Sequence, residues 1–259
     1  MTDTSAPIGR RTVLIAGSAA AATLAVSAAG TAAAGPGTEA PTAAAADAAP
    51  VAAAAVCTLT KEMTEGPYYL DGQLVRADIT EDKAGIPLEL TLTVVDDDTC
   101  AAVGNALVEI WHADALGEYS GFVGSNGHQE PDNGTFLRGG VLTGSDGVAK
   151  ITTIYPGWYR GRCIHIHLKV HTGVTLTEDG SFTGGQELHT GQLFFDEAVT
   201  TQVARISPYS TNTVARTTLA QDSIYDEGGA ASGLLTLTPL GSSASAGYAG
   251  TLTVGVERS

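Results

Sequence analysis

The stretch Tyr155–His167 reads YPGWYRGRCIHIH, and its last residues begin an alternation of apolar and polar side chains that continues as IHIHLKVHT over residues 164–172. Side chains two residues apart on a β-strand project from the same face. His165 and His167 are therefore expected on one face, and Ile166 in the opposite layer. The pattern predicts a strand with one face in a core and two imidazoles on the other.

Similar strand signals recur along the chain between turns rich in glycine and aspartate. We expect strands within residues 87–96, 106–113, 136–143, 148–155, 164–172, 191–197, 233–240 and 248–256. The turn Ser145-Asp146-Gly147 predicts that 136–143 and 148–155 form a hairpin. One weak helical pattern lies around Leu219. About eight strands without a long helical period predict an all-β protein, an antiparallel β-sandwich with few short helices.

The N-terminal residues differ in composition from the rest of the chain. Arg10 and Arg11 precede an apolar run diluted by alanine, glycine, serine and threonine. This layout predicts a twin-arginine signal peptide over 1–34 and secretion to the extracellular space; a membrane anchor is the alternative. Residues 35–55, rich in alanine and proline, predict a flexible tether. The folded domain is then expected over 56–259, with no membrane partner after signal cleavage.

Charge restricts the partners of the predicted domain. The 259-residue chain carries 13 Lys and Arg against 28 Asp and Glu, a formal net charge of −15. Such acidity disfavours nucleic acid and anionic membranes through long-range repulsion. The 43% of hydrophobic residues is enough for one large domain. We expect no nucleic-acid partner, and a monomer or homodimer.

Three cysteines are consistent with an exported protein. An odd number leaves at least one free thiol or an intermolecular bond. Cys163 lies at the start of the predicted buried strand, so a disulfide between Cys57 and Cys100 is the economical pairing. Two free cysteines in addition to Cys163 remain the alternative.

The pair His165 and His167 is by itself a weak metal signal, because two histidines on a strand are more often solvent-facing. Other motifs change this weighing. In chain order they are EGPYYL (65–70), WHAD (111–114), GEYS (117–120), PGWY (156–159) and R-x-x-H-x-H (162–167). Together these motifs resemble those of the intradiol ring-cleavage dioxygenases, the family of catechol 1,2-dioxygenase and protocatechuate 3,4-dioxygenase.

The resemblance implies a non-haem Fe(III) site. Its ligands would be the tyrosinates Tyr119 and Tyr159, the imidazoles His165 and His167, and a solvent hydroxide. Tyr159 would also be a catalytic base that leaves the metal when a catechol binds, and Arg162 would stabilise negative charge on the ring. The remaining four histidines receive no role: His112, His128, His171 and His189.

The residue types themselves support a ferric site. A phenol with a pKa of about 10 binds metal at neutral pH only when a strongly Lewis-acidic cation displaces its proton. Fe(III) is such a cation, whereas zinc usually takes cysteine, histidine or carboxylate ligands. The resemblance further implies catechols and O2 as substrates and muconate-type diacids as products.

Two more features concern the substrate. Tyr68 and Tyr69 are weak candidates for lining its pocket. Only two residues separate Tyr159 from Arg162, fewer than in the protocatechuate enzymes, which predicts a more open site that admits bulkier catechols.

Two alternatives remain. One is a secreted β-sandwich module that binds metal or carbohydrate without redox activity, and the other is a zinc hydrolase. A carbohydrate module should show a planar row of exposed aromatics, and aromatics are only 6% of the chain. A hydrolase would need a carboxylate base, yet no Asp or Glu lies between Asp146 and Glu178. Both alternatives predict a colourless protein.

Overall fold

The computed structural model describes residues 57, 59–71, 74–122, 132, 134–225 and 230–258, which all belong to one compact unit. The predicted signal peptide 1–34, the predicted tether 35–55 and His128 lie outside the described residues. None of the described helices is long and apolar enough to cross a membrane.

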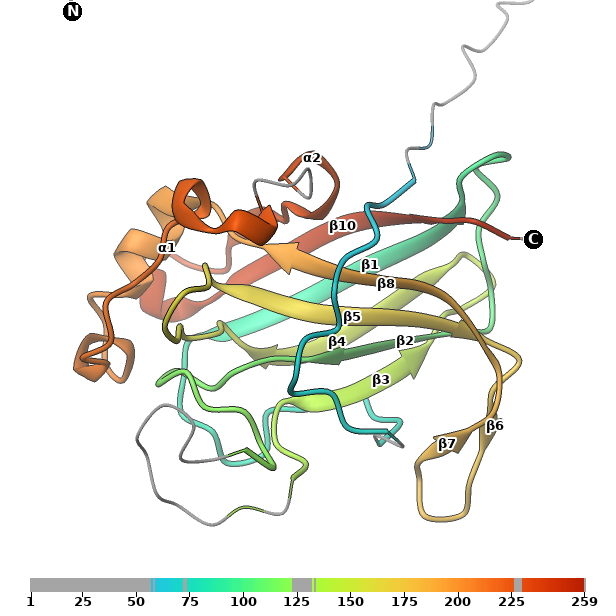
Figure 1. The fold of residues 1–259 in the computed structure, drawn as a ribbon, viewed down its shortest axis with the longest axis horizontal. Coiled ribbons are helices and arrows are strands. Elements are labelled where there is room, and N and C mark those ends of the chain that lie inside the picture. Colours follow the sequence, from blue (N-terminus) through green and yellow to red (C-terminus); the bar gives the residue numbers. More distant parts are fainter. Residues whose placement is uncertain are drawn as a thin grey trace, which may run out of the picture. The chain divides into compact units, whose positions relative to one another are not determined.

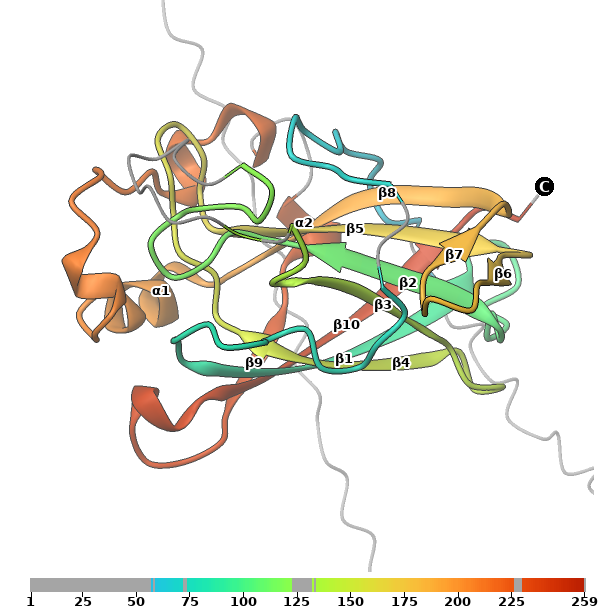
Figure 2. The same cartoon turned by 90° about the horizontal axis from the view of Figure 1, so that it is seen from below.

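Two four-stranded sheets pack face to face, as Figures 1 and 2 show. The first sheet has the order β4 (Val148–Ile154), β1 (Pro87–Asp96), β10 (Tyr248–Val256) and β9 (Thr236–Pro239). The second has the order β3 (Arg138–Leu142), β2 (Ala106–Trp111), β5 (His165–Thr172) and β8 (Gln186–Phe194). Two short strands, β6 (Thr175–Leu176) and β7 (Phe182–Thr183), pair with each other. The predicted all-β sandwich is confirmed.

Two features of the pairing differ from the prediction. Strand β1 pairs parallel with β10, so the first sheet is mixed. The predicted hairpin of 136–143 with 148–155 is wrong, because β3 pairs with β2 in one sheet and β4 pairs with β1 in the other. The turn itself forms, since Gly144 N donates to the Val148 carbonyl at 3.0 Å. A turn signal describes only a few residues and does not determine which sheet the next strand enters.

The helices are short. They are α1 (Glu197–Val203) and α2 (Ala230–Gly233), with 3₁₀ turns η1 (Tyr209–Thr211), η2 (Leu219–Gln221) and η4 (Ala244–Ala246). Strand β8 ends at Phe194, before the end of the predicted strand 191–197, because Asp196 caps α1 by accepting from the amides of Ala198 and Val199. The pattern around Leu219 produces the turn η2, and residues 223–225 after it are also helical.

The core lies between the sheets and separates the two faces of β5. From β5, Ile166, Leu168 and Val170 enter this core, where they meet leucines of β1. Full burial of each such side chain contributes about 1.5–3 kcal/mol. The opposite face of β5 is crossed by residues 59–71, which we call the strap (Figure 1). The strap amide of Met63 donates to Thr190 of β8 at 2.8 Å.

Candidate metal centre

Four side chains converge at the end of β5 that carries the two histidines. From Nε2 of His165, the distances are 3.1 Å to Nε2 of His167, 3.3 Å to Oη of Tyr159 and 3.4 Å to Oη of Tyr119. The face predicted for the two histidines is therefore correct. The structure also brings both tyrosines to them, while their role as metal ligands stays a prediction.

Tyr119 is held by the loop that follows β2. Asp114 organises this loop, because its Oδ1 accepts from the amides of Leu116 at 2.9 Å and Glu118 at 3.0 Å. A carboxylate that accepts two amides fixes a tight local turn. Tyr119 is only 1% exposed, so its ring has little freedom.

Tyr159 lies in a second loop that docks on the first. Gly157 N donates to the Asp114 carbonyl at 3.0 Å, and a side chain at 157 would collide with the Ala115 carbonyl. Asn212 joins the loops, donating to the carbonyls of Trp158 at 2.8 Å and Leu116 at 3.2 Å. These contacts set the distance between the two tyrosine-bearing loops.

The imidazoles are oriented by their surroundings. Nδ1 of His165 lies 2.7 Å from the Cys163 carbonyl, which requires the proton on Nδ1 and leaves a lone pair on Nε2. The ring of His167 stacks on Trp111, with centroids 4.9 Å apart and an interplanar angle of 5°. Gly66 of the strap, at φ +70°, passes close to the same ring. Nε2 of each histidine thus points into the cluster.

Burial keeps all four groups neutral. Burial raises the pKa of Tyr119 well above its usual value, and the nearby Tyr159 adds to this effect. Burial raises the pKa of Tyr159 to about 12, although the Arg162 guanidinium opposes the shift. Burial also lowers the pKa of His165 and His167 well below the usual value. The phenols would therefore ionise here only against a strongly Lewis-acidic cation.

The donor set fits Fe(III). Among the described residues, no group of three or more His, Cys, Asp or Glu side chains could hold a metal, so a metal at this cluster depends on the phenols. Donors bound to one ion at about 2.0–2.1 Å lie about 2.9–3.4 Å apart, and the three distances from His165 are 3.1–3.4 Å. Hard phenolate oxygens favour a small trivalent ion over zinc.

Arg162 is fixed beside the cluster and is not a free surface charge. Its Nε donates to Asp222 at 2.9 Å, its Nη2 donates to Gln192 at 2.6 Å, and its Nη1 lies 3.5 Å from Nε2 of His165. Sequence analysis did not identify Asp222 and Gln192, which lie 60 and 30 residues downstream of the arginine. Neither residue lies in a sequence motif that indicates a contact with Arg162.

The neighbouring strap residues Tyr68 and Tyr69 have different surroundings. The ring of Tyr68 stacks on Tyr119 at 4.5 Å and meets Tyr159 edge-on at 5.9 Å, so Tyr68 borders the cluster. Tyr69 Oη instead donates to Oε2 of buried Glu109 at 3.3 Å. Tyr69 thus faces the other end of the same sheet surface.

That other end is built around ion pairs. Nε2 of His171 lies 2.9 Å from Oε2 of Glu109, which is fully buried. Nζ of Lys169 lies 2.7 Å from Glu65 and 2.8 Å from Glu187. Sequence analysis assigned these residues no role, and the structure pairs them with one another, while Oε1 of Glu109 has no hydrogen-bond partner among the described residues.

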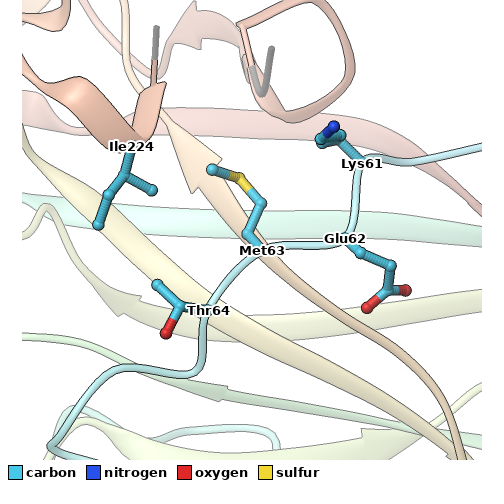
Figure 3. A pocket seen from close by; sticks show the side chains of 5 residues that line it. All are labelled: Lys61, Glu62, Met63, Thr64 and Ile224. Atoms are coloured by element: carbon cyan, nitrogen blue, oxygen red, sulfur yellow. The ribbon is translucent and has the colours of Figure 1, made fainter. Parts of the chain in front are cut away.

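A pocket of about 310 Å³ lies between the strap and Ile224. It is lined by Lys61, Glu62, Met63, Thr64 and Ile224 (Figure 3). Both of its walls connect to the residues that hold the candidate arginine. The Thr64 carbonyl accepts from Gln192 at 2.8 Å, and the Ile224 amide donates to Asp222 at 2.9 Å.

The three cysteines occupy two environments. A disulfide joins Cys57 to Cys100 and closes a loop of 43 residues. Cys163 is buried and free, and burial raises the pKa of its thiol. The structure has the economical pairing that the sequence suggested.

Comparison with known proteins gives related enzymes. A family model described as "Dioxygenase" matches residues 64–164, a span that includes both tyrosines and ends just before His165. Catechol 1,2-dioxygenase 1 of Acinetobacter lwoffii is 38% identical over 105 residues, 39% of this chain and 32% of the relative. Chlorocatechol 1,2-dioxygenase of Pseudomonas sp. strain P51 is 33% identical over 122 residues, 46% and 44% of the two chains. This chain thus spans less than half of either relative.

Solved structures match over a larger share. An intradiol ring-cleavage dioxygenase from Tetranychus urticae is 32% identical, with a TM-score of 0.66 over 78% of this chain and 95% of that one. The dioxygenase domain of a carbohydrate-binding fusion protein from Streptomyces sp. SirexAA-E is 24% identical, with a TM-score of 0.53 over 78% of this chain and all of that one. The second likeness concerns the fold alone.

Proposed function

Because this chain belongs to the intradiol ring-cleavage dioxygenases, we propose that it cleaves a catechol ring between the two hydroxylated carbons with O2. The product is a muconate-type diacid that contains both oxygen atoms. The observation that carries the proposal is the convergence of Tyr119, Tyr159, His165 and His167 next to Arg162. Relatives named as catechol and chlorocatechol dioxygenases support a catechol substrate.

The proposed cofactor is non-haem Fe(III), held by the two phenol oxygens and the two Nε2 atoms. Ferric iron, when bound, supplies a Lewis acid that binds a deprotonated catechol and draws electron density from its ring. The strap and Trp111 cover His167, which limits access of water to this side of the site.

The two tyrosines have different proposed tasks. Tyr119 is 1% exposed and stacks on Tyr68, so it is the permanent ligand. Tyr159 is less buried and stands at the rim. We assign its Oη as the base that takes a proton from one catechol hydroxyl when the substrate enters.

Arg162 is the proposed electrostatic catalyst. Its anchors, Asp222 and Gln192, hold the guanidinium in one orientation while Nη1 faces the cluster. A preorganised cation at this point stabilises negative charge that develops on the bound ring, and it needs no rearrangement during the reaction.

The pocket between the strap and Ile224 is the proposed place for a ring substituent. Met63 and Ile224 provide its apolar contacts, and the Ile224 amide donates to Asp222, which anchors Arg162. A pocket of about 310 Å³ supports the expectation of a site for bulkier catechols. Comparable turnover of catechol and of a catechol with a ring substituent is expected, and strict preference for unsubstituted catechol would contradict this.

Export remains part of the proposal. The paired arginines of the N-terminal segment suggest secretion by the twin-arginine route to the extracellular space, and a disulfide is typical of exported proteins. Mass spectrometry of protein from the culture medium would test this. It would identify the new N-terminus and show that the disulfide lowers the mass by two hydrogen atoms.

The alternative is a secreted binding module without redox activity. The two candidate functions predict proteins of different colour, because tyrosinate bound to Fe(III) produces a visible charge-transfer band and the binding module has none. The test is the visible spectrum of the ferric protein before and after anaerobic addition of catechol, followed by O2. We expect a broad band that moves to longer wavelength with catechol and bleaches when O2 enters.

A matched pair of variants controls this spectrum. Tyr119→Phe removes one proposed ligand oxygen and keeps the stacked ring, so the band should weaken or vanish. Tyr248→Phe alters a buried tyrosine between the two sheets and should leave the band unchanged. A protein that stays colourless with Fe(III) and ignores catechol would refute the proposed function and favour the binding module.

A further inference from the structure

Arg138 is a second guanidinium near the cluster, at the start of β3, and it is 2% exposed. It donates two hydrogen bonds to Ser120, the residue after Tyr119. Nε donates to Oγ of Ser120 at 2.7 Å, and Nη2 donates to the Ser120 carbonyl at 2.8 Å. Its Nη1 is buried and has no hydrogen-bond partner among the described residues. A buried donor without a partner is costly and calls for a physical account.

The charge of Arg138 is also unmatched. Arg162 forms an ion pair with Asp222, whereas no carboxylate forms an ion pair with Arg138 among the described residues. Burial lowers the pKa of Arg138 to about 10, and the charges of Tyr119, Asp132 and Glu109 oppose this shift. The guanidinium therefore keeps its charge at neutral pH.

One candidate for a counter-charge is Tyr119. Cζ of Arg138 lies 6.0 Å from the centre of the Tyr119 ring and 6.0 Å from that of Phe122. A buried cation that lacks a partner is strongly destabilising unless a negative group joins it. A tyrosine that binds a ferric ion is such a group.

We propose that Arg138 is a positioning residue of the metal centre: it aims the Tyr119 oxygen through Ser120, and its unmatched charge balances the negative charge that Tyr119 carries when bound to metal. This inference rests on the proposed function. It assigns the two arginines different tasks, because Arg162 is anchored by Asp222 and faces His165, whereas Arg138 holds Ser120, the residue after Tyr119.

The test uses metal binding and not activity. Fe(III), and Ga(III) as a redox-inert substitute, are titrated into the domain while tyrosinate absorption is recorded. Arg138→Met keeps much of the side-chain volume and removes the charge, and it should weaken binding of both ions about 10- to 100-fold, the usual effect of removing a partner that supports a ligand. Arg138→Lys keeps the charge without the fork and should recover most of this loss.

Arg76→Met is the matched control. Arg76 donates to the carbonyls of Thr135 and Arg138, so its loss loosens the same segment without removing charge from behind Tyr119. Metal affinity of this variant should stay near that of the wild type. An equal loss in Arg76→Met and Arg138→Met would show a merely structural role and overturn the inference.

Other outcomes are equally decisive. Unchanged affinity in folded Arg138→Met overturns the inference but leaves the proposed function standing. If Arg138→Met fails to fold by circular dichroism, Arg138→Lys decides: affinity within about tenfold of wild type supports charge balance, and a larger loss refutes it. A wild-type protein that binds neither ion refutes the proposed function and this inference with it.

Discussion

The two ends of the outer face of β5 carry similar residues with different partners. At one end, His165 and His167 direct Nε2 atoms at each other and at two phenols, and no carboxylate joins them in the described residues. At the other end, His171 is paired with Glu109, and Lys169 is held between two glutamates.

The difference separates residues that can bind a ligand from residues that stabilise the fold. An imidazole whose Nε2 faces a carboxylate uses that atom within the protein. An imidazole whose Nδ1 faces a carbonyl, as in His165, keeps the Nε2 lone pair for a metal. Hence histidines on the same strand face need not share a function, and carboxylates near them distinguish the two cases.

The largest expected effect comes from removing a proposed metal ligand at the end of β5 that carries His165 and His167. His167→Leu removes one imidazole donor, so Fe(III) affinity should fall by more than the roughly 10- to 100-fold loss typical of supporting residues. The free energy of unfolding of the metal-free domain should fall by only about 0.5–1.5 kcal/mol, because the contact with Nε2 of His165 is a single neutral hydrogen bond. Metal titration and chemical denaturation measure the two effects. A metal affinity equal to wild type would refute the ligand assignment.

His112 is a third kind of histidine, and its burial makes the free energy of unfolding depend on pH. His112 lies between the Ala113 carbonyl and Oγ1 of Thr153, both at 2.8 Å. Burial lowers its pKa to about 4, against the opposing effect of the Ala113 carbonyl. In the unfolded chain a histidine titrates near 6.5.

His112 therefore stabilises the fold fully above pH about 6.5, and up to about 3 kcal/mol is lost as the pH falls to about 4, because only the unfolded chain takes up the proton. Unfolding free energies across this range should fall less steeply in His112→Gln than in the wild type. Identical slopes for both proteins would contradict the assignment.

The smallest expected effect comes from removing the imidazole of His171, at the other end of the same face of β5. Among the described residues, His171→Leu leaves Oε2 of buried Glu109 with only Tyr69 as a partner, so the free energy of unfolding should fall by about 1–3 kcal/mol. Metal affinity should stay at the wild-type level, in contrast to His167→Leu. A loss of metal affinity in His171→Leu would show that the two ends are coupled.

Much of the fold could be predicted where a strong alternation lies between clear turns. The strand at 87–96 matches β1, and that at 248–256 matches β10. The faces of β5 followed from the same period. Asp196 ended the strand predicted over 191–197, because its side chain caps α1, and this competing cap signal was overlooked.

Other features have no local signature. The parallel pairing of β1 with β10 and the split of β3 from β4 depend on how whole sheets assemble. The candidate ligands were found because each stands in a short motif. Asp222, Gln192 and Arg138 were missed because their partners lie far away in the sequence.

The sequence by itself determined the strand period, hence the face of each β5 side chain, and placed the four candidate ligands in local motifs. Only the tertiary structure decided which polar groups on that face remain available. Carboxylates from β2, β8 and the strap satisfy His171 and Lys169, whereas two loops bring phenols to His165 and His167. The physical reason is range: hydrogen bonds and ion pairs act over about 3 Å through space, whatever the separation along the chain.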